Sequence, residues 1–183
     1  MGALGIGLIV VLGIVFILFI WYFSTFNGIR TSELKVTEAL SGIDVALTKR
    51  FDVLTKMLDT VKGYMSYEKQ TLTDIVRLRS GMTMGERIEA NKNMDNVRRD
   101  INILAEQYPE LRSSNNFVEL QRSIVDVEEH LQAARRLYNS NVTDYNRRII
   151  TFPSNIVAGM MGATRKAYFE ADEAKRQDVK MTF

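Results

Sequence analysis

The sequence contains no cysteine, a single histidine and only two prolines among its 183 residues. Without cysteine the chain has no disulfide, no thiolate metal site, no cysteine nucleophile and no cysteine-linked lipid anchor. The histidine, His130, has no histidine or cysteine partner, so we expect a solvated or edge position rather than a ligand or general-base role. The sequence also lacks a Gly-x-Ser-x-Gly elbow and a phosphate-binding loop. We therefore predict no enzymatic activity, no cofactor and no bound metal.

Charge is missing from the first 29 residues, because all 24 basic and 22 acidic residues lie from Arg30 onward. Residues 4–23 form an apolar run that, as a helix, spans about 30 Å, the thickness of the hydrocarbon core of a bilayer. Aromatic side chains end the run, as at a membrane interface, at Trp21, Tyr22 and Phe23. The alternative is a buried core helix, but core helices seldom run this long without charge. We predict an uncleaved membrane anchor over residues 1–27.

The orientation prediction depends on the basic residues that flank the anchor. Arg30, Lys35, Lys49 and Arg50 follow the apolar run and no basic residue precedes it, which favours a cytoplasmic C-terminal part and a single-pass topology. The net charge is only +2, and the arginine pairs of the later part are spread along the chain and interleaved with acids. We therefore expect membrane lipid, and not nucleic acid, as a partner.

Beyond the anchor the apolar residues recur at steps of three and four, and no segment longer than four residues alternates as a half-buried strand does. This pattern predicts an all-α fold with helices over residues 33–80, 84–108, 117–151 and 154–164. Short connections favour antiparallel neighbours. The predicted architecture is an N-terminal transmembrane helix followed by an elongated antiparallel four-helix bundle over residues 28–172, with residues 173–183 as a C-terminal tail.

Local signals mark the ends of these helices. Gly81 is a plausible C-cap, and Thr83 has the capping-box spacing to Glu86 for the second helix. Pro109 is expected to stop that helix near Tyr108, and Asn116 is a suitable N-cap for the third. A proline and a serine begin the fourth helix.

Several polar residues fall on the apolar faces, where burial of an unpaired charge is costly. The charged members are Arg50, Glu68, Glu128 and Arg135. We expect them to pair across the bundle and to set the register of its helices; the alternative is that they line a binding groove or a contact between protomers. The pairs Tyr138-Asn139 and Tyr145-Asn146 lie seven residues apart, a spacing that suits a core or interface ladder rather than a ligand platform.

Motifs along nearly the whole chain resemble those of a known family: Phe26-Asn27, Ile43-Asp44-Val45, Val61-Lys62-Gly63-Tyr64, Tyr67-Glu68, Tyr108-Pro109, Tyr138-Asn139, Tyr145-Asn146, Phe152-Pro153 and Tyr168-Phe169-Glu170. The sequence resembles the LemA family of bacterial membrane proteins. It departs from the family pattern at Thr55-Lys56, where a Pro-Asn pair is typical, and at Tyr67, which replaces a histidine. The resemblance implies a membrane-anchored, elongated four-helix bundle without an established enzymatic activity. We predict that the protein lies in the bacterial inner membrane.

These observations favour a non-enzymatic scaffold that self-associates at a bacterial membrane, with a second copy of the chain and membrane lipid as partners. Ala3 and Gly7 form a small-xxx-small pair in the anchor, and Val45 and Val53 lie outside the principal apolar seam. The alternative is a monomer in which these extra apolar residues belong to a wide core-facing surface of the helix. Two other function classes stay open: an adaptor that docks on a membrane enzyme or sensor and regulates it, and an enzyme or transporter subunit.

Overall fold

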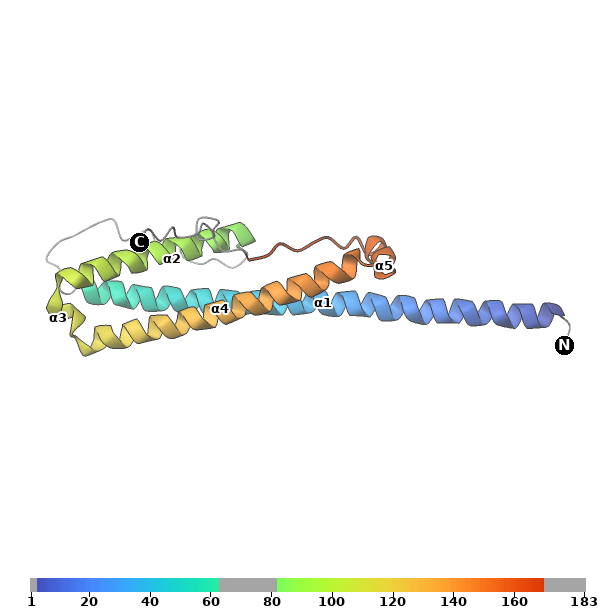
Figure 1. Ribbon diagram of the computed structural model, residues 1–183, viewed down its shortest axis with the longest axis horizontal. Helices are drawn as coiled ribbons and strands as arrows, with labels where there is room; N and C mark the ends of the chain where they lie inside the picture. Colours follow the sequence, from blue (N-terminus) through green and yellow to red (C-terminus); the bar gives the residue numbers. More distant parts are fainter. Residues whose placement is uncertain (1–2, 63–81, 170–183) are drawn as a thin grey trace, which may run out of the picture. The chain divides into compact units, whose positions relative to one another are not determined.

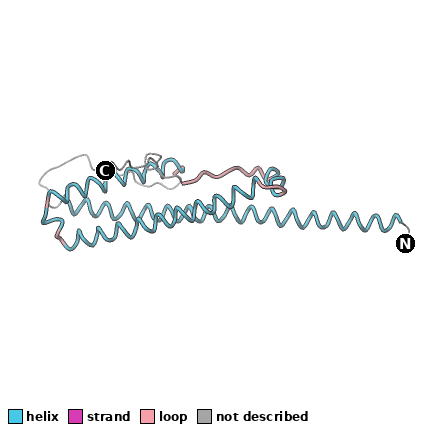
Figure 2. The backbone as a smooth tube through the Cα atoms, in the orientation of Figure 1, coloured by secondary structure: helices cyan, strands magenta, loops and turns pink. Residues whose placement is uncertain are grey.

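A computed structural model describes residues 3–62 and 82–169, and side chains from residue 7 onward. Within these ranges every regular element is a helix, which confirms the all-α prediction (Figure 1; Figure 2). The order is α1 (Ala3–Lys62), α2 (Met84–Gln107), α3 (Pro109–Arg112), α4 (Asn115–Ile150) and α5 (Ser154–Met160). The chain divides into unit 1, residues 1–38 and 139–167, and unit 2, residues 39–138 and 168–183.

The first part of α1 is long and apolar enough to cross a membrane. Its large apolar side chains from Leu8 to Ile20 are each more than half exposed, so the rest of the described chain does not cover them. A helix that buries its own backbone hydrogen bonds and presents apolar side chains all round suits lipid rather than water. The apolar segment therefore indicates a single-pass membrane anchor.

Unit 1 packs the C-terminal part of α4 against α1. Asn141 Nδ2 donates to the carbonyl of Lys35, and a Cβ at Gly28 would lie 3.0 Å from Nη1 of Arg148. From Lys35 to Gly28 the residue number falls along α1, while the contacted residue of α4 rises from Asn141 to Arg148. The two helices therefore run in opposite directions here. The buried apolar residues of the unit are Ile29, Val36, Val142, Tyr145, Ile149, Val157 and Ala158.

Unit 2 contains the larger core. Its buried residues come from α1, α2, α3 and the start of α4: Leu54, Met57, Leu58, Val61, Met94, Ile101, Ala105, Leu111, Phe117 and Ile124. Apolar positions three, four and seven apart on each helix supply these residues, because that spacing places side chains on one face. The core of unit 2 positions the polar side chains described below.

The expected antiparallel four-helix bundle is not what the described residues show. Asp44 pairs with Arg87 and Arg50 with Asp95, so contacts advance together along α1 and α2, and these helices run in the same direction. The antiparallel expectation assumed short connections, whereas residues 63–81 separate the two helices. In addition, α3 has four residues and α5 has seven, so the described part of the chain holds three long helices.

The helix ends test the local signals. Thr83 and Glu86 form the predicted capping box, and α2 ends at Gln107, close to the predicted stop. The N-cap of α4 was predicted wrongly: Ser114, not Asn116, accepts the backbone N–H of Phe117, because α4 begins earlier. Both residue types are good caps, so the local sequence does not separate them.

The last helix is shorter than predicted, since α5 ends at Met160 and Thr164 lies outside it. Gly162 adopts a φ of 63°, and the N–H of Ala163 bonds to the carbonyl of Ala158, which closes the helix in a left-handed turn. The predicted continuation of the first helix to residue 80 and the Gly81 cap lie outside the described residues.

Candidate functional site

The candidate site is a charge cluster in unit 2 whose centre is Arg50 of α1. Arg50 follows the core position Leu47 by three residues and precedes Leu54 by four, so helix geometry places it on the packed face. Only 2% of its surface is exposed. Its Nη2 donates to Asp95 Oδ1 at 2.5 Å and to Glu128 Oε1 at 3.0 Å. A cation this deeply buried requires such partners, because removing an unpaired ion from water costs several kcal/mol, about as much as a folded domain can lose.

The partners of Arg50 come from two further helices. Asn91 and Asp95, one turn apart on α2, both accept from the guanidinium, with Arg50 Nη1 at 2.5 Å from Asn91 Oδ1. Glu128 of α4 also accepts from Arg98 of α2, so this carboxylate lies between two arginines. The cluster of Arg50, Asn91, Asp95, Arg98 and Glu128 thus links α1, α2 and α4 through charge-assisted hydrogen bonds.

The predicted residue Arg135 lies near this cluster rather than in it. Burial lowers the pKa of the Arg135 guanidinium, the negative charge of Asp95 opposes that change, and the positive charge of Arg50 adds to it. The guanidinium carbon lies 4.7 Å from the ring centroid of Phe169, a residue that is 2% exposed. This contact places an aromatic face over the half-buried arginine. Arg135 therefore contributes a cation–π contact beside the cluster.

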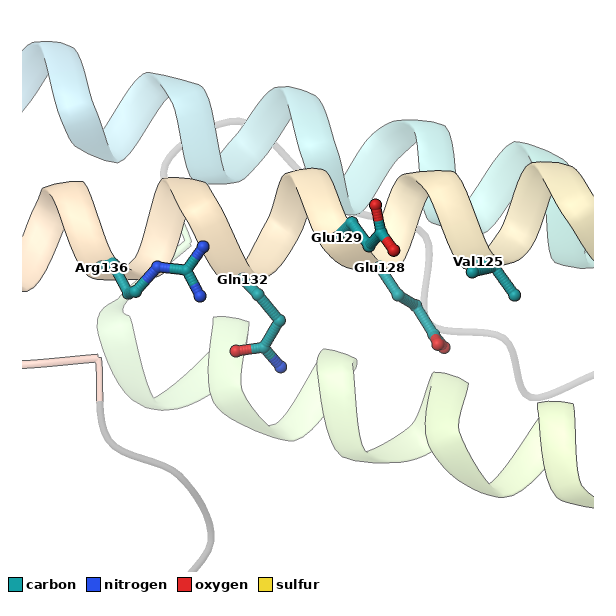
Figure 3. A pocket seen from close by; sticks show the side chains of 5 residues that line it. All are labelled: Val125, Glu128, Glu129, Gln132 and Arg136. Carbon is teal, nitrogen blue, oxygen red and sulfur yellow. The ribbon is translucent and has the colours of Figure 1, made fainter.

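An open cleft of about 450 Å³ adjoins the cluster. Among the described residues, those that line it belong to α4: Val125, Glu128, Glu129, Gln132 and Arg136. Figure 3 shows Glu128 and Gln132 extending from α4 to the same side of the helix. Glu128 thus belongs to both the cluster and the cleft. The cleft offers two carboxylates, an amide and a guanidinium, which suits a polar peptide surface better than an apolar ligand.

The chemistry of the cluster favours a structural role. Its carboxylates accept hydrogen bonds from guanidinium groups of neighbouring helices, which engages them in helix packing. In residues 3–62 and 82–169 no group of three or more histidine, aspartate or glutamate side chains is placed to hold a metal ion. The arrangement can hold three helices in a defined rotation and register.

A second link between α1 and α2 was missed by the sequence reasoning. Arg87 binds Asp44 through two hydrogen bonds, Nε to Oδ1 at 2.6 Å and Nη2 to Oδ2 at 2.8 Å, and also donates to the carbonyl of Met82. The hydrogen bond to Asp44 raises the pKa of Arg87, against the effect of burial. A signal was present: Arg87 precedes the buried Met94 and Ile101 at intervals of seven residues.

In unit 1 the predicted Tyr145-Asn146 pair holds the segment that follows α5. Asn146 accepts the backbone N–H of Lys166 and donates to its carbonyl, both at 2.9 Å. Lys166 Nζ lies 2.9 Å from Glu33 Oε1 of α1 and 5.6 Å from the Tyr145 ring centroid. Tyr145 is 1% exposed, and burial raises the pKa of its hydroxyl. These contacts fasten residue 166 against α1 and α4.

The ion pair between Lys166 and Glu33 should depend on pH. The hydrogen bond from Lys166 holds the pKa of Glu33 below its ordinary value of 4.5, against the opposing effect of burial. A carboxyl with a lowered folded pKa stabilises the fold above pH 4.5 and loses that contribution as the pH falls through its folded pKa. The amide resonance of Lys166 in NMR spectra should therefore titrate with a midpoint below pH 4.5, and Glu33→Gln should abolish the transition. The exposed neighbour Glu38 supplies the control Glu38→Gln, which should leave the transition intact. A midpoint above pH 4.5 would contradict the assignment.

The remaining predicted residues are distributed as follows. Tyr138 is 4% exposed and Asn139 is half-buried, whereas Glu68 lies outside the described residues. In the anchor, Trp21 and Tyr22 are half-buried, Phe23 is 46% exposed and Gly7 has open space around it; the side chain of Ala3 is outside the described set. Val45 is 56% exposed, but Val53 packs against the core of unit 2 and is no free surface.

Comparison with known proteins identifies the family. The family model described as LemA family matches residues 39–183. The chain is 32% identical to Protein LemA of Metamycoplasma hominis over 158 residues, which cover 84% of this chain and 72% of that protein. It is also 31% identical over 71 residues to Magnetosome protein MamQ 2 of Paramagnetospirillum magneticum and 30% identical over 71 residues to Magnetosome protein MamQ of Magnetospirillum gryphiswaldense. These two alignments cover 39% of this chain and 26% of each relative. The resemblance seen in the motifs is thereby confirmed, and the chain belongs to the LemA family.

Proposed function

We propose that this chain is a membrane-anchored, non-enzymatic interaction protein that self-associates at a bacterial membrane. The observation that carries the proposal is on α1, which presents exposed apolar side chains both in the anchor and beyond it. Val45 is 56% exposed although its neighbours Ala46 and Leu47 are buried in unit 2. Confinement of the chain to a plane raises the effective concentration of such surfaces, so a weak lateral contact can hold an assembly.

The charge cluster supports the non-enzymatic part of the proposal. Arg50 binds both Asp95 and Glu128, so these charges stabilise the packing of helices. His130, which the sequence placed at an edge, is exposed on α4.

Self-association is tested by the mass of the full-length protein in mild detergent. Val45→Glu places a charge on the proposed contact and Gly7→Leu blocks close approach of anchors, so each should lower the mass toward that of one chain of 20.9 kDa. Leu137→Glu is the matched control, because Leu137 is 58% exposed on α4 and should leave the mass unchanged. A single-chain mass for the unsubstituted protein refutes the assembly.

The adaptor is the alternative, and the cleft on α4 favours it. Its lining by Glu128, Glu129, Gln132 and Arg136 suits a polar segment of another membrane protein. The two functions differ in one measurement: a scaffold forms a defined assembly when it is purified alone, whereas an adaptor is monomeric until its partner is added. Arg136→Glu should then abolish partner binding and leave the mass of the isolated protein unchanged.

A further inference from the structure

The corner between α4 and α5, defined here as residues 150–160, presents apolar side chains to the outside of unit 1. Phe152 is 76% exposed, Met160 71%, Ile150 51% and Ile156 48%. No other large apolar side chain among the described ones is as exposed as Phe152. Such a concentration of exposed apolar groups marks an interaction surface rather than ordinary solvated surface.

The register between α4 and α1 places this corner at the end of the membrane anchor. The contacts Asn141 to Lys35 and Arg148 to Gly28 are seven residues apart on each helix, in opposite directions. Continuing the same register by two residues puts Ile150 level with Phe26. That position is three residues past Phe23, or about 4.5 Å along the helix axis beyond the apolar run. The corner therefore lies at the depth of the lipid headgroups if α1 spans the bilayer.

The charge of the surrounding sequence fits the same location. Residues 145–169 contain four basic residues and no acidic residue. Three of them are exposed: Arg147, which pairs with Asp144, and Arg148 and Arg165. Arg148 lies next to Gly28. Apolar side chains flanked by arginines are the composition of segments that lie in the interface of anionic membranes.

We propose that the α4–α5 corner is a second membrane contact, in which Phe152, Ile156 and Met160 enter the headgroup region beside the anchor while Arg148 and Arg165 face lipid phosphates. Val157 and Ala158, both buried, hold α5 to unit 1 and leave its other side free for lipid. A protein partner is the less favoured occupant, because the corner is continuous with a helix already surrounded by lipid. This contact requires that α1 spans the membrane, and it does not require that the chain self-associates.

The absence of cysteine permits a direct test with single-cysteine variants of the full-length protein. Ile156→Cys and Met160→Cys, labelled with an environment-sensitive fluorophore, are reconstituted in phosphatidylcholine–phosphatidylglycerol vesicles at no more than one chain per vesicle. Ile103→Cys is the matched control, since Ile103 is 49% exposed on α2 in unit 2 and Ile156 is 48% exposed. Phe16→Cys reports on the anchor itself.

The proposal expects a blue-shifted emission at positions 156 and 160 that is quenched by spin-labelled lipid headgroups and not by aqueous iodide, with the opposite behaviour at position 103. Water-like emission at 156 and 160, with lipid-like emission at 16, overturns it and leaves the anchor standing. A blue shift that appears only at high protein density, or that lipid quenchers do not affect, assigns the corner to a protein partner and also overturns it. Water-like emission at 16 overturns the anchor together with this contact.

Discussion

Replacement of Arg50 by methionine is expected to lower the free energy of unfolding by about 3 kcal/mol, the lower end of what the loss of one partner from a buried ion pair costs. Methionine keeps most of the side-chain volume, so packing changes little. The loss comes from Asp95 and Glu128, whose side chains are 27% and 25% exposed and would face each other without Arg50. Their partial hydration is the reason for choosing the lower end of the range.

Urea unfolding of the full-length protein in mild detergent, followed by far-ultraviolet circular dichroism, measures this effect. Arg98→Met is the matched control, because Arg98 also binds Glu128 but is 32% exposed, and exposed pairs contribute about 1 kcal/mol or less. A double-mutant cycle of Arg50→Met with Glu128→Gln isolates the coupling between the two residues. If Arg50→Met costs no more than Arg98→Met, the cluster does not hold the helices together.

The second large effect is expected in the anchor. Val11→Arg with Val15→Arg puts two charges on one face of α1, at residues that are 57% and 56% exposed. Each arginine near the centre of a membrane helix costs about 3 kcal/mol of insertion free energy, so the pair costs about 6 kcal/mol. We expect the double variant to leave the membrane fraction after cell-free synthesis with bacterial inner-membrane vesicles.

Resistance to alkaline carbonate extraction separates inserted from peripheral protein in this experiment. Leu34→Arg with Val45→Arg is the control, because both residues are exposed on the same helix but lie beyond the apolar run. The control should remain inserted as the unsubstituted chain does. Retention of the double anchor variant in the carbonate-resistant pellet would show that α1 does not insert through residues 4–23.

Much of the helical architecture is predictable because the determinants are local. The periodicity of three and four predicts α2 and α4 to within a few residues, since a helix forms its hydrogen bonds within one segment. The Thr83–Glu86 capping box and the stop before Pro109 involve groups at most four residues apart. The apolar anchor is equally local, because its length and lack of charge depend on residues 1–29 alone.

The candidate site was only half predictable from the sequence. The position of Arg50 on an apolar face indicated burial and therefore a need for partners. Glu128 was among the candidates, whereas Asn91 and Asp95, which lie 41 and 45 residues away, were not. Asp44 and Arg87 were missed for the same reason, since their pairing spans 43 residues.

The sequence by itself determined that the chain is helical, that its first segment is apolar enough for a membrane and that Arg50 needs compensation. The tertiary structure alone decided that α1 and α2 run in the same direction, that Asp95 and Glu128 meet at one guanidinium, and that Lys166 returns to Glu33. The physical reason is that hydrogen bonds within a helix leave its rotation and direction relative to other helices undefined. Packing of side chains far apart in the sequence sets both, and with them every contact between helices.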